Sequence, residues 1–328
     1  MVYTNRQDMK NKYIWIALFA FVLLLAICLR LFSPNRPRLV WIVEDRFIEA
    51  WEQALPSSPF RKTILTPLSA AESPLPRHWY GYRIGCRQGP NTPDGNGNSI
   101  RVYHELTRQG RYEEALALTV DPWLVFRRSA TPPLNREMAE RGPVGNGRIF
   151  MAGSDRSAVR AWTAQLLQET PGVFSEDEER WDRIGERLFI GRNFQAGALT
   201  YRWEEIWPYL LGEDEAVWVY CPLSRIRELP ADETEDLKAD VFPTRPEWDE
   251  FGIQVDILWA IPYGSRNNRK KLTSAETWLQ SAAAQSQIAN TLGWLAAHQS
   301  TRPFNPISWN AQKAWLTASY VWEMIAQE

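Results

Sequence analysis

Apolar positions near the start of the chain predict a strand, a helix and a second strand. Leu39–Val43 is a continuous apolar run of the length typical of a buried strand. The next segment carries an apolar stripe at helical spacing, formed by Phe47, Ile48, Trp51, Ala54 and Leu55. Pro56 ends that helix, and the segment "KTILTPL" contains the second strand. Because a crossover helix joins parallel strands, this order predicts a parallel pair and an α/β fold.

The middle of the chain predicts further short elements. The segment "LTVDPWLVF" is typical of a strand, a tight turn at Asp121 and Trp123, and a re-entrant strand. Residues 127–147 are rich in Pro, Arg and Gly, which makes them a candidate crossing between two lobes. A helix is expected over residues 202–211, ended by a glycine and followed by a strand over residues 216–220. "ADVFPTRP" and "GIQVDILWAIP" are expected to form short strands.

Two amphipathic helices are predicted towards the C-terminus. Thr273 and Glu276 have the spacing of a capping box at the start of the first helix, and Gly293 is its expected stop. Its apolar stripe is formed by Ala275, Trp278, Leu279, Ala282, Ile288, Ala289 and Leu292. The last helix is expected from about Asn310. Its stripe is formed by Ala314, Trp315, Ala318, Val321, Trp322 and Ile325.

Basic residues precede an apolar run at the N-terminus. Three of them stand within the first twelve positions, and Ile14–Leu29 follows. Positive charge before an apolar segment keeps the N-terminus inside and directs the following chain across the membrane. Cys28 lies in "LLLAIC", which resembles a lipoprotein cleavage site, although Ile27 replaces the usual small residue. Lipidation of Cys28 and an uncleaved anchor both stay open, and either would tether an extracytoplasmic protein.

The composition limits the classes of function. The chain has 328 residues, 45% of them hydrophobic, which is enough for a substantial core, and its 17 Trp could stack on ring-shaped ligands. Residues 39–328 carry a net charge of −7, which argues against a nucleic-acid surface. The three histidines share no metal-ligand spacing, and the sequence has no nucleophile elbow, GxGxxG segment or P-loop, so no enzyme is predicted. Cys86 and Cys221 could pair in an oxidising compartment, but their spacing does not decide this.

One segment is a near match to a calcium-binding loop. Asp94, Asn96, Asn98 and Glu105 stand at positions one, three, five and twelve of that loop. Ser99 occupies position six, where glycine makes the sharp turn. A surface turn rich in Gly and Asn is the favoured interpretation, and no cofactor is expected.

The segment "TWLQSAAAQSQIANTLGWLAA" resembles the late helix of bacterial extracellular sugar-binding proteins of ABC importers. In that family an aromatic-Leu pair precedes Ser, Ala-Gln, a small residue and Gly. The positions that match in register are Trp278, Leu279, Ser281, Ala284, Gln285, Ala289 and Gly293. Upstream, "WAIPYGSRNNRKK" resembles the strand and turn before that helix, and "GALTYRWEEIWPYLLGEDEAVWVY" resembles a helix that ends in Gly before a strand. The resemblance covers about residues 197–297.

The resemblance implies a two-lobed, periplasmic-binding-protein-like α/β fold with a central cleft, preceded by the N-terminal apolar anchor helix. It divides the chain into residues 1–33 as the signal or membrane anchor, 34–38 as a tether, 39–130 as the first lobe, 131–270 as mainly the second lobe, and 271–328 as helices that pack on the lobes. Closure of the lobes around a solute is the motion that such a division serves.

The resemblance also implies a function. The protein would be tethered outside the cytoplasm, capture a sugar or similar small solute as a monomer, and deliver it to ABC permease subunits. Sugars are held by aromatic faces and polar groups, which in open α/β sheets lie beyond the carboxyl ends of strands. The candidate ligand-binding residues are Glu44, Asp45, Asp121, Trp123, Tyr220 and Trp259. The alternative is a membrane-anchored scaffold of the same fold that interacts with other proteins and has lost solute binding.

Overall fold

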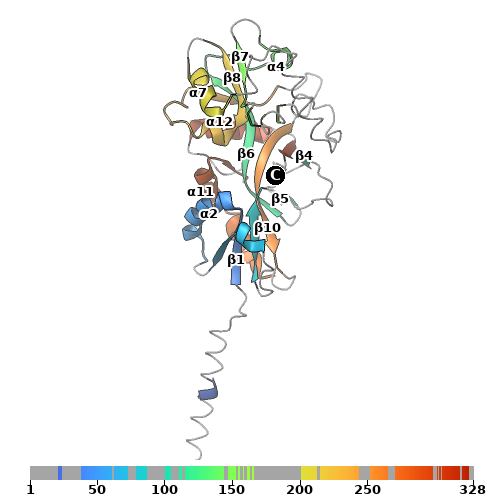
Figure 1. Cartoon of the computed structure of the whole chain (residues 1–328). Helices are drawn as coiled ribbons and strands as arrows, with labels where there is room; N and C mark the ends of the chain where they lie inside the picture. Colours follow the sequence, from blue (N-terminus) through green and yellow to red (C-terminus); the bar gives the residue numbers. More distant parts are fainter. Residues whose placement is uncertain are drawn as a thin grey trace, which may run out of the picture.

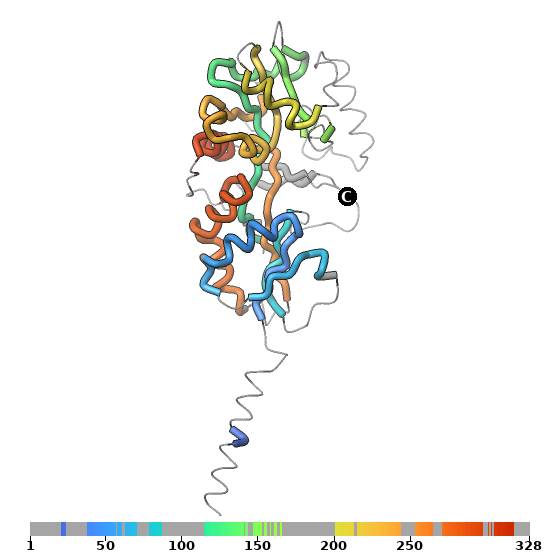
Figure 2. Tube along the Cα trace, turned by 60° about the vertical axis from the view of Figure 1, so that its left-hand side comes forward, coloured from blue at the N-terminus to red at the C-terminus, as the bar shows by residue number. Residues whose placement is uncertain are grey.

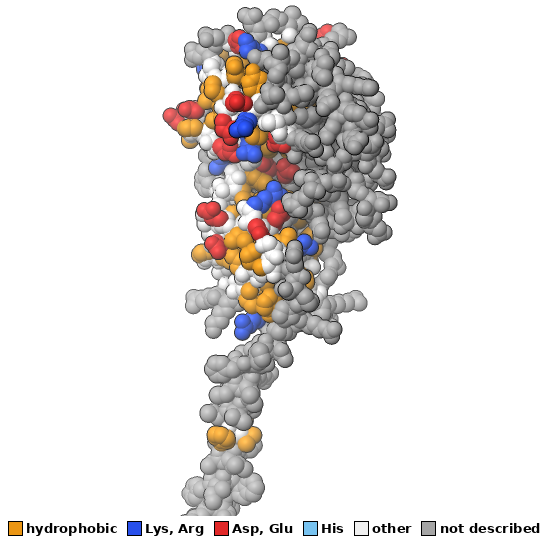
Figure 3. Space-filling model, viewed as in Figure 1, with side chains coloured by type: hydrophobic (Ala, Val, Ile, Leu, Met, Phe, Trp, Pro, Cys, Tyr) orange, Lys and Arg blue, Asp and Glu red, His pale blue; other side chains and the backbone are white. Residues whose placement is uncertain are grey.

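The computed structural model describes two lobes stacked end to end, with two long strands passing between them (Figure 1, Figure 2). The described residues are 21–23, 38–60, 63–72, 79–86, 100–104, 111–112, 115–143, 147–152, 154–155, 158, 161–162, 165, 201–212, 215–243, 252–264, 270–297, 301, 303, 305–317 and 320–324. On the face in Figure 3, the described acidic and basic side chains are interspersed, in agreement with the small net charge of the chain.

In the described residues, twelve strands belong to one mixed sheet with the main order β2-β1-β3-β10-β6-β8-β7. These strands are β1 (Arg38–Val43), β2 (Ile64–Pro67), β3 (Trp79–Gly85), β6 (Ala115–Arg128), β7 (Arg148–Phe150), β8 (Val217–Pro222) and β10 (Gly252–Tyr263). The shorter strands beside them are β4 (Ile100–His104), β5 (Arg111–Tyr112), β9 (Leu237–Asp240), β11 (Leu295–Ala296) and β12 (Tyr320–Met324). Strand β1 pairs in parallel with β2 and β3, which confirms the predicted parallel pair.

Strands β6 and β10 connect the two lobes (Figure 1). The first half of β6 pairs antiparallel with β10, and its second half pairs with β8 and β9. The predicted tight turn at Asp121 and Trp123 is therefore wrong, because both residues lie inside one continuous strand. Pro122, which has no N–H to donate, lies where β6 leaves β10 for β8. The predicted crossing over residues 127–147 is also wrong, since the lobes are joined by β6 and β10.

The first lobe packs three helices on one face of the sheet. They are α2 (Ile48–Ala54), α10 (Thr273–Leu279) and α11 (Ala282–Leu292), with the 3-10 turns η1 (Asp45–Phe47), η2 (Leu55–Ser57), η3 (Ser69–Glu72) and η4 (Lys270–Leu272). The core between sheet and helices is aromatic. The ring centroid of Trp41 lies 5.4 Å from that of Trp51, and 5.8 Å from those of both Tyr82 and Trp278. Several tryptophans of the chain therefore serve as core residues.

The second lobe surrounds the other end of β6. Its helices are α4 (Arg136–Arg141), α7 (Trp203–Leu211), α8 (Leu223–Ile226) and α12 (Pro306–Thr317), placed around β7, β8 and β9 (Figure 1). Helix α7 and strand β8 confirm the helix and strand predicted in this region. The buried Trp162 ring meets Phe242 edge-on with centroids 4.9 Å apart. This lobe thus has an aromatic core of its own.

The late helices differ from the prediction in two places. The first predicted helix is broken into α10 and α11, because Ser281 starts α11 by accepting a hydrogen bond from Ala284 N at 3.3 Å. Leu272, not Thr273, occupies the N-cap position of α10. Gly293 ends α11 as predicted, with a left-handed φ of 73°. Helix α12 stops at Thr317, and Val321 and Trp322 of the predicted stripe lie in β12, which pairs with β10 and β4. Ala318 and Ile325 of that stripe lie outside the described residues.

The apolar residues after Gly293 extend the sheet. Leu295 and Ala296 form β11, which pairs antiparallel with β6. The backbone N of Ala297 donates to the carbonyl of Leu118 at 3.0 Å. The chain therefore continues apolar after the helix stop because it returns to β6 and is buried there.

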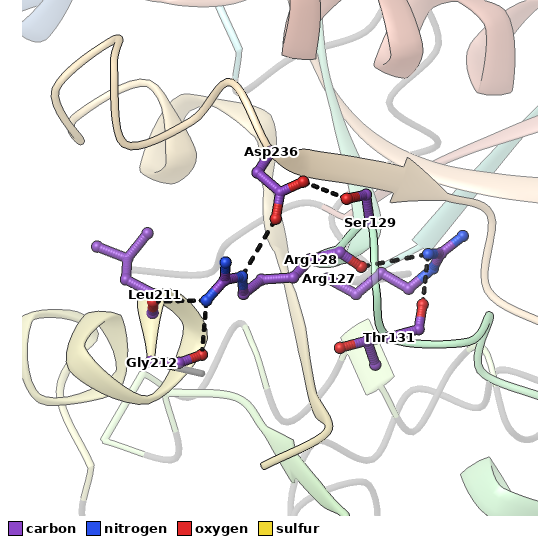
Figure 4. A network of polar contacts seen from close by, with 7 residues as sticks. All are labelled: Arg127, Arg128, Ser129, Thr131, Leu211, Gly212 and Asp236. Carbon is purple, nitrogen blue, oxygen red and sulfur yellow. Dashed lines mark hydrogen bonds and ion pairs between the residues drawn. The ribbon is translucent and has the colours of Figure 1, made fainter. Parts of the chain in front are cut away.

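A network of arginines fixes the second-lobe end of β6 (Figure 4). Arg128 reaches Asp236 through Nε at 3.2 Å, and its Nη1 donates to the carbonyls of Leu211 and Gly212 at the end of α7. The Asp236 carboxylate also accepts from the Ser129 hydroxyl. Cations are favourable beside the carbonyl end of a helix, so this strand end is held by α7 as well as by β9.

Several predictions fall on residues that the structure does not describe. Phe21, Val22 and Leu23 lie in a helix and are 53–63% exposed, but the remainder of the predicted anchor, with Cys28, lies outside the described residues. Among the described residues, no helix combines the length and the hydropathy needed to cross a membrane. The predicted calcium loop also lies outside them: Asp94, Asn96, Asn98 and Glu105.

Candidate functional site

Polar side chains gather on one face of the strands that connect the lobes. Asp121 of β6 pairs in register with Asp256 of β10, so their side chains lie on the same face. Side chains two residues apart on a strand share a face, which adds Thr119 and Trp123 on β6 and Gln254 on β10. We call these five residues the crossing face.

Asp121 is buried and is held by the second lobe. It is 2% exposed, and its Oδ1 accepts from Ser224 N at 3.0 Å while its Oδ2 accepts from Ser224 Oγ at 2.5 Å. Strand β8 places Ser224 there, because α8 begins directly after that strand ends. Burial raises the pKa of Asp121 to about 8, against the opposing effect of the Ser224 hydrogen bonds, and the charge of Asp256 raises it further.

Asp256 lies opposite and is half-buried. Its Oδ2 accepts from Trp123 Nε1 at 3.2 Å. Burial raises the pKa of Asp256 to about 6, while the Trp123 hydrogen bond and the charge of Arg46 act to lower it and the charge of Asp155 acts to raise it. The crossing face therefore places two desolvated carboxyl groups opposite each other, so that their charges disfavour one another.

Two further polar side chains on this face are buried without hydrogen-bond partners. Gln254 is 1% exposed, and neither its amide nitrogen nor its amide oxygen is bonded. Thr119 is fully buried, and its hydroxyl has no partner. A buried polar group without a partner costs about 1–3 kcal/mol. Such groups are rare in native proteins and call for a specific explanation.

Aromatic rings lie beside the crossing face in the second lobe. The centroid of Tyr220 is 5.7 Å from that of Trp123, 5.6 Å from Trp162 and 5.5 Å from Phe242. Tyr220 is fully buried, and burial raises the pKa of its hydroxyl well above the usual value. This packing orients the Trp123 indole, and with it the N–H that reaches Asp256.

The first-lobe candidates follow β1. Glu44 is 8% exposed, and its carboxylate accepts from Cys86 N at 3.0 Å and pairs with Arg46 Nε at 2.7 Å. A Cβ on Gly85 would lie 2.8 Å from Glu44 Oε2, so a larger residue at this position would displace the carboxylate. Asp45 is exposed and accepts from Ser69 N at 3.2 Å, and the Ser69 hydrogen bonds lower its pKa. Asp45 thus braces the end of β2, whereas Arg46 is the first-lobe charge that acts on Asp256.

The structure brings together only some of the residues that the sequence singled out. Asp121, Trp123 and Tyr220 form one cluster. Trp259 is fully buried and does not belong to it, because the pairing of β10 with β6 shifts in register between Leu258 and Trp259. Trp259 belongs to the sheet core, where it lies opposite Gly85. A ligand would reach Tyr220 or Trp259 only if neighbouring side chains moved. Ligand binding by any of the six candidates stays a prediction.

Sequence reasoning missed Asp256, Gln254, Thr119 and Ser224. The signal for Asp256 was present, because it is the single charge in the apolar run "GIQVDILWAIP", and charged residues are seldom buried without a partner. Ser224 carried no such signal, because only the fold brings α8 to β6. Among the described residues, no group of His, Cys, Asp and Glu could hold a metal ion. Cys86 and Cys221 are not bonded to each other.

Neither a protein-family model nor a curated protein matches the chain. Solved structures do share its fold. A probable secreted solute-binding lipoprotein from Streptomyces coelicolor superposes with a TM-score of 0.57 at 12% identity, over 89% of this chain and 90% of that one. The bacterial solute receptor AcbH, described as preferring β-D-galactopyranose exclusively, gives 0.57 at 14% identity over 88% and 87%. A Bordetella ferric binding protein gives 0.51 at 14% identity over 85% and 96%.

These likenesses define the class of fold. The chain has the mixed α/β, two-lobed fold of solute-binding proteins, and this part of the predicted fold class is confirmed. The neighbours include a receptor named for a sugar and one named for iron, so the fold alone does not select the solute. The predicted anchor helix and domain boundaries stay predictions.

Proposed function

We propose that this protein is a tethered, extracytoplasmic solute-binding protein that captures a small solute between its lobes and delivers it to an ABC importer. The observation that carries the proposal is the crossing face. It lies on the two strands that join the lobes, and it contains buried polar groups that have no hydrogen-bond partner in the part of the chain that the structure describes. Because Gln254 and Thr119 are 1% and 0% exposed, a polar ligand would satisfy these groups only once neighbouring side chains had moved.

The arrangement of the lobes supports the mechanism. Each lobe has its own aromatic core, so each can move as a unit. Asp121 is bonded to α8 of the second lobe, and Arg46 of the first lobe acts on Asp256. A solute bound at the crossing face would contact both lobes and so favour the closed arrangement of the two.

The N-terminal segment supports the location. Basic residues followed by the apolar run Ile14–Leu29 would place the lobes outside the cytoplasm, with the membrane or a lipid on Cys28 as the tether. Permease subunits of an importer would be the protein partners. Fractionation of cells that express the full chain tests this, because full-length protein in the soluble cytoplasmic fraction would exclude the tether.

A thermal-shift screen of the full-length protein tests solute binding. The panel should contain neutral sugars, amine-bearing sugars, amino acids, inorganic anions and ferric ion. A solute at one hundred times its Kd stabilises the folded protein by about 2.7 kcal/mol, which is a rise in Tm of several degrees. If no member of the panel raises Tm, the solute-binding proposal fails and the scaffold alternative takes its place.

The matched control separates the crossing face from the rest of the surface. Trp123→Phe removes the indole N–H at the crossing face, whereas Trp309→Ala removes a 38% exposed ring on α12. We expect the solute response to weaken in the first variant and to stay unchanged in the second. Equal weakening in both variants would place the site elsewhere.

A further inference from the structure

The charges around the crossing face do not balance. Asp121 and Asp256 face each other, and Asp155 adds to the negative potential at Asp256. Arg46 acts on Asp256 and Arg225 acts on Asp121, but both of these described cations are already paired with other carboxylates. Arg46 lies 2.7 Å from Glu44, and Arg225 lies 2.9 Å from Glu228. Arg46 and Arg225 are thus each paired with another carboxylate. The charge that remains at the crossing face is that of Asp256, because the raised pKa of Asp121 keeps its carboxyl mostly protonated at neutral pH.

The unpartnered side chains point to a ligand independently of the charge. Gln254 shares its face of β10 with Asp256, and Thr119 shares its face of β6 with Asp121. Gln254 offers one acceptor and two donors, and Thr119 offers a hydroxyl, all of them buried and unbonded. Groups of this kind are satisfied by hydroxyl or amide substituents of a solute.

We infer that the crossing face binds a small polar solute that carries a protonated amine, with the amine at Asp256 and hydroxyl or amide groups at Gln254 and Thr119. This inference rests on the proposed solute-binding function and specifies the chemical class of the solute. An ammonium group donates up to three hydrogen bonds and supplies the missing positive charge. Trp123 holds the Asp256 carboxylate from one side through Oδ2.

The spacing of the groups sets the size of the solute. Gln254 and Asp256 are two residues apart on one strand, which is about 6.5 Å. Thr119 lies opposite Leu258, so the span from Gln254 to Thr119 along the strands is about 13 Å. A single amine-bearing sugar ring fits the shorter distance, and a two-ring solute fits the longer one.

Matched ligand pairs test the inference on the full-length protein. Glucosamine is compared with glucose, and galactosamine with galactose, because each pair differs only in an amine replacing a hydroxyl. We expect titration calorimetry to give at least tenfold tighter binding for an amine than for its neutral counterpart. Equal or tighter binding of the neutral sugars would overturn the inference and leave the proposed function intact. Binding of only anions or iron would also overturn it, and no binding by any solute would overturn both.

A charge-removing substitution locates the effect. Asp256→Asn keeps the size of the side chain and should lower amine affinity at least tenfold while leaving that of the neutral counterpart within about twofold. Glu204→Gln, an exposed change in α7, removes the same charge from a residue outside the crossing face and should leave both affinities unchanged. Far-ultraviolet circular dichroism checks the folding of both variants. An amine preference that survives Asp256→Asn in a folded protein would contradict the assignment.

Discussion

The two halves of strand β6 place their charged side chains in opposite environments. In its second half, Arg127 and Arg128 meet Asp240 and Asp236, and the pKa of Asp236 is lowered by the Ser129 and Arg128 hydrogen bonds. In its first half, Asp121 faces Asp256 without a bonded arginine, and burial raises both pKa values. Asp121 and Arg127 are thus only six residues apart on one strand. Arg127 pairs with a carboxylate that the fold stabilises, whereas Asp121 is a carboxyl whose burial costs stability.

The contrast between the two halves of β6 distinguishes charges that stabilise the fold from charges that do not. In the Arg127 and Arg128 network the arginines bond to carboxylates and carbonyls of the protein, so the network stabilises the second lobe. The crossing face holds two carboxyls at a cost and leaves Gln254 unbonded beside them. A protein retains such costs chiefly where they serve binding or catalysis. The predictions below test this contrast, from the largest expected effect to the smallest.

Arg127→Ala should cause the largest loss of stability. Its Nε lies 2.5 Å from Asp240 Oδ2, and its Nη1 donates to the carbonyl of Thr131 at 2.5 Å. Removal leaves a partly buried carboxylate and a buried carbonyl unpaired, which we expect to cost about 2–4 kcal/mol, since Asp240 keeps some solvent. Urea unfolding measures this directly.

The control for Arg127→Ala lies on the neighbouring strand. Lys238 pairs in register with Arg127 but is exposed. Lys238→Ala should change the free energy of unfolding by less than about 0.5 kcal/mol. Similar losses in both variants would mean that the network contributes no more than an ordinary surface charge.

Much of the fold could be predicted from the sequence because local patterns and tertiary contacts agree there. The strand β1, helix α2 and strand β2 follow from one apolar run and one helical stripe. The continuous strand β6 could not be predicted, because "DP" is a turn signal and only the change of partner from β10 to β8 keeps the chain extended. The sequence of β12 suits a helical stripe equally well, and pairing with β10 and β4 decides its state.

The candidate site was less predictable than the fold. The rule that ligand groups follow strand ends selected Asp121 and Trp123 for a turn that does not exist, yet both residues lie on the crossing face. The same rule selected Tyr220 and Trp259, which are fully buried. Asp256 was detectable as a lone charge in an apolar strand. Its pairing with Asp121 depends on register across more than a hundred residues, which no local pattern encodes.

Asp121→Asn should make the protein more stable than the native protein, and this difference in stability should grow as the pH rises. The raised pKa means that the folded state favours the protonated carboxyl, so its contribution to stability is present below about pH 4 and is lost as the pH rises towards 8. Asparagine does not ionise, and it can still accept from Ser224 N and donate to Ser224 Oγ. We expect Tm at pH 8.5 to exceed that of the native protein by about 3 °C or more, with a smaller difference at pH 5.

Asp236→Asn is the counterpart on the other half of β6. The lowered pKa of Asp236 reverses the sign of the change in stability, because the folded state favours the charged carboxylate. This variant should lower Tm at neutral pH, and the difference should vanish as the pH falls below about 4. Parallel pH profiles for the two variants would remove the contrast between the two halves of the strand.

Apart from the control Lys238→Ala, Trp123→Phe should have the smallest effect on stability. The phenyl ring keeps the contact with Tyr220, whose centroid lies 5.7 Å from that of Trp123, but the N–H that reaches Asp256 is lost. Because Asp256 is half-buried and water can replace part of this bond, we expect a loss of about 1 kcal/mol or less. The pKa of Asp256 should rise further, since the Trp123 hydrogen bond acts to lower it. Carbon-detected NMR titration of the Asp256 carboxyl measures this shift. An unchanged pKa in a folded variant would show that Trp123 packs at the crossing face without holding the carboxylate, and that the pKa of Asp256 is set by burial, Arg46 and Asp155.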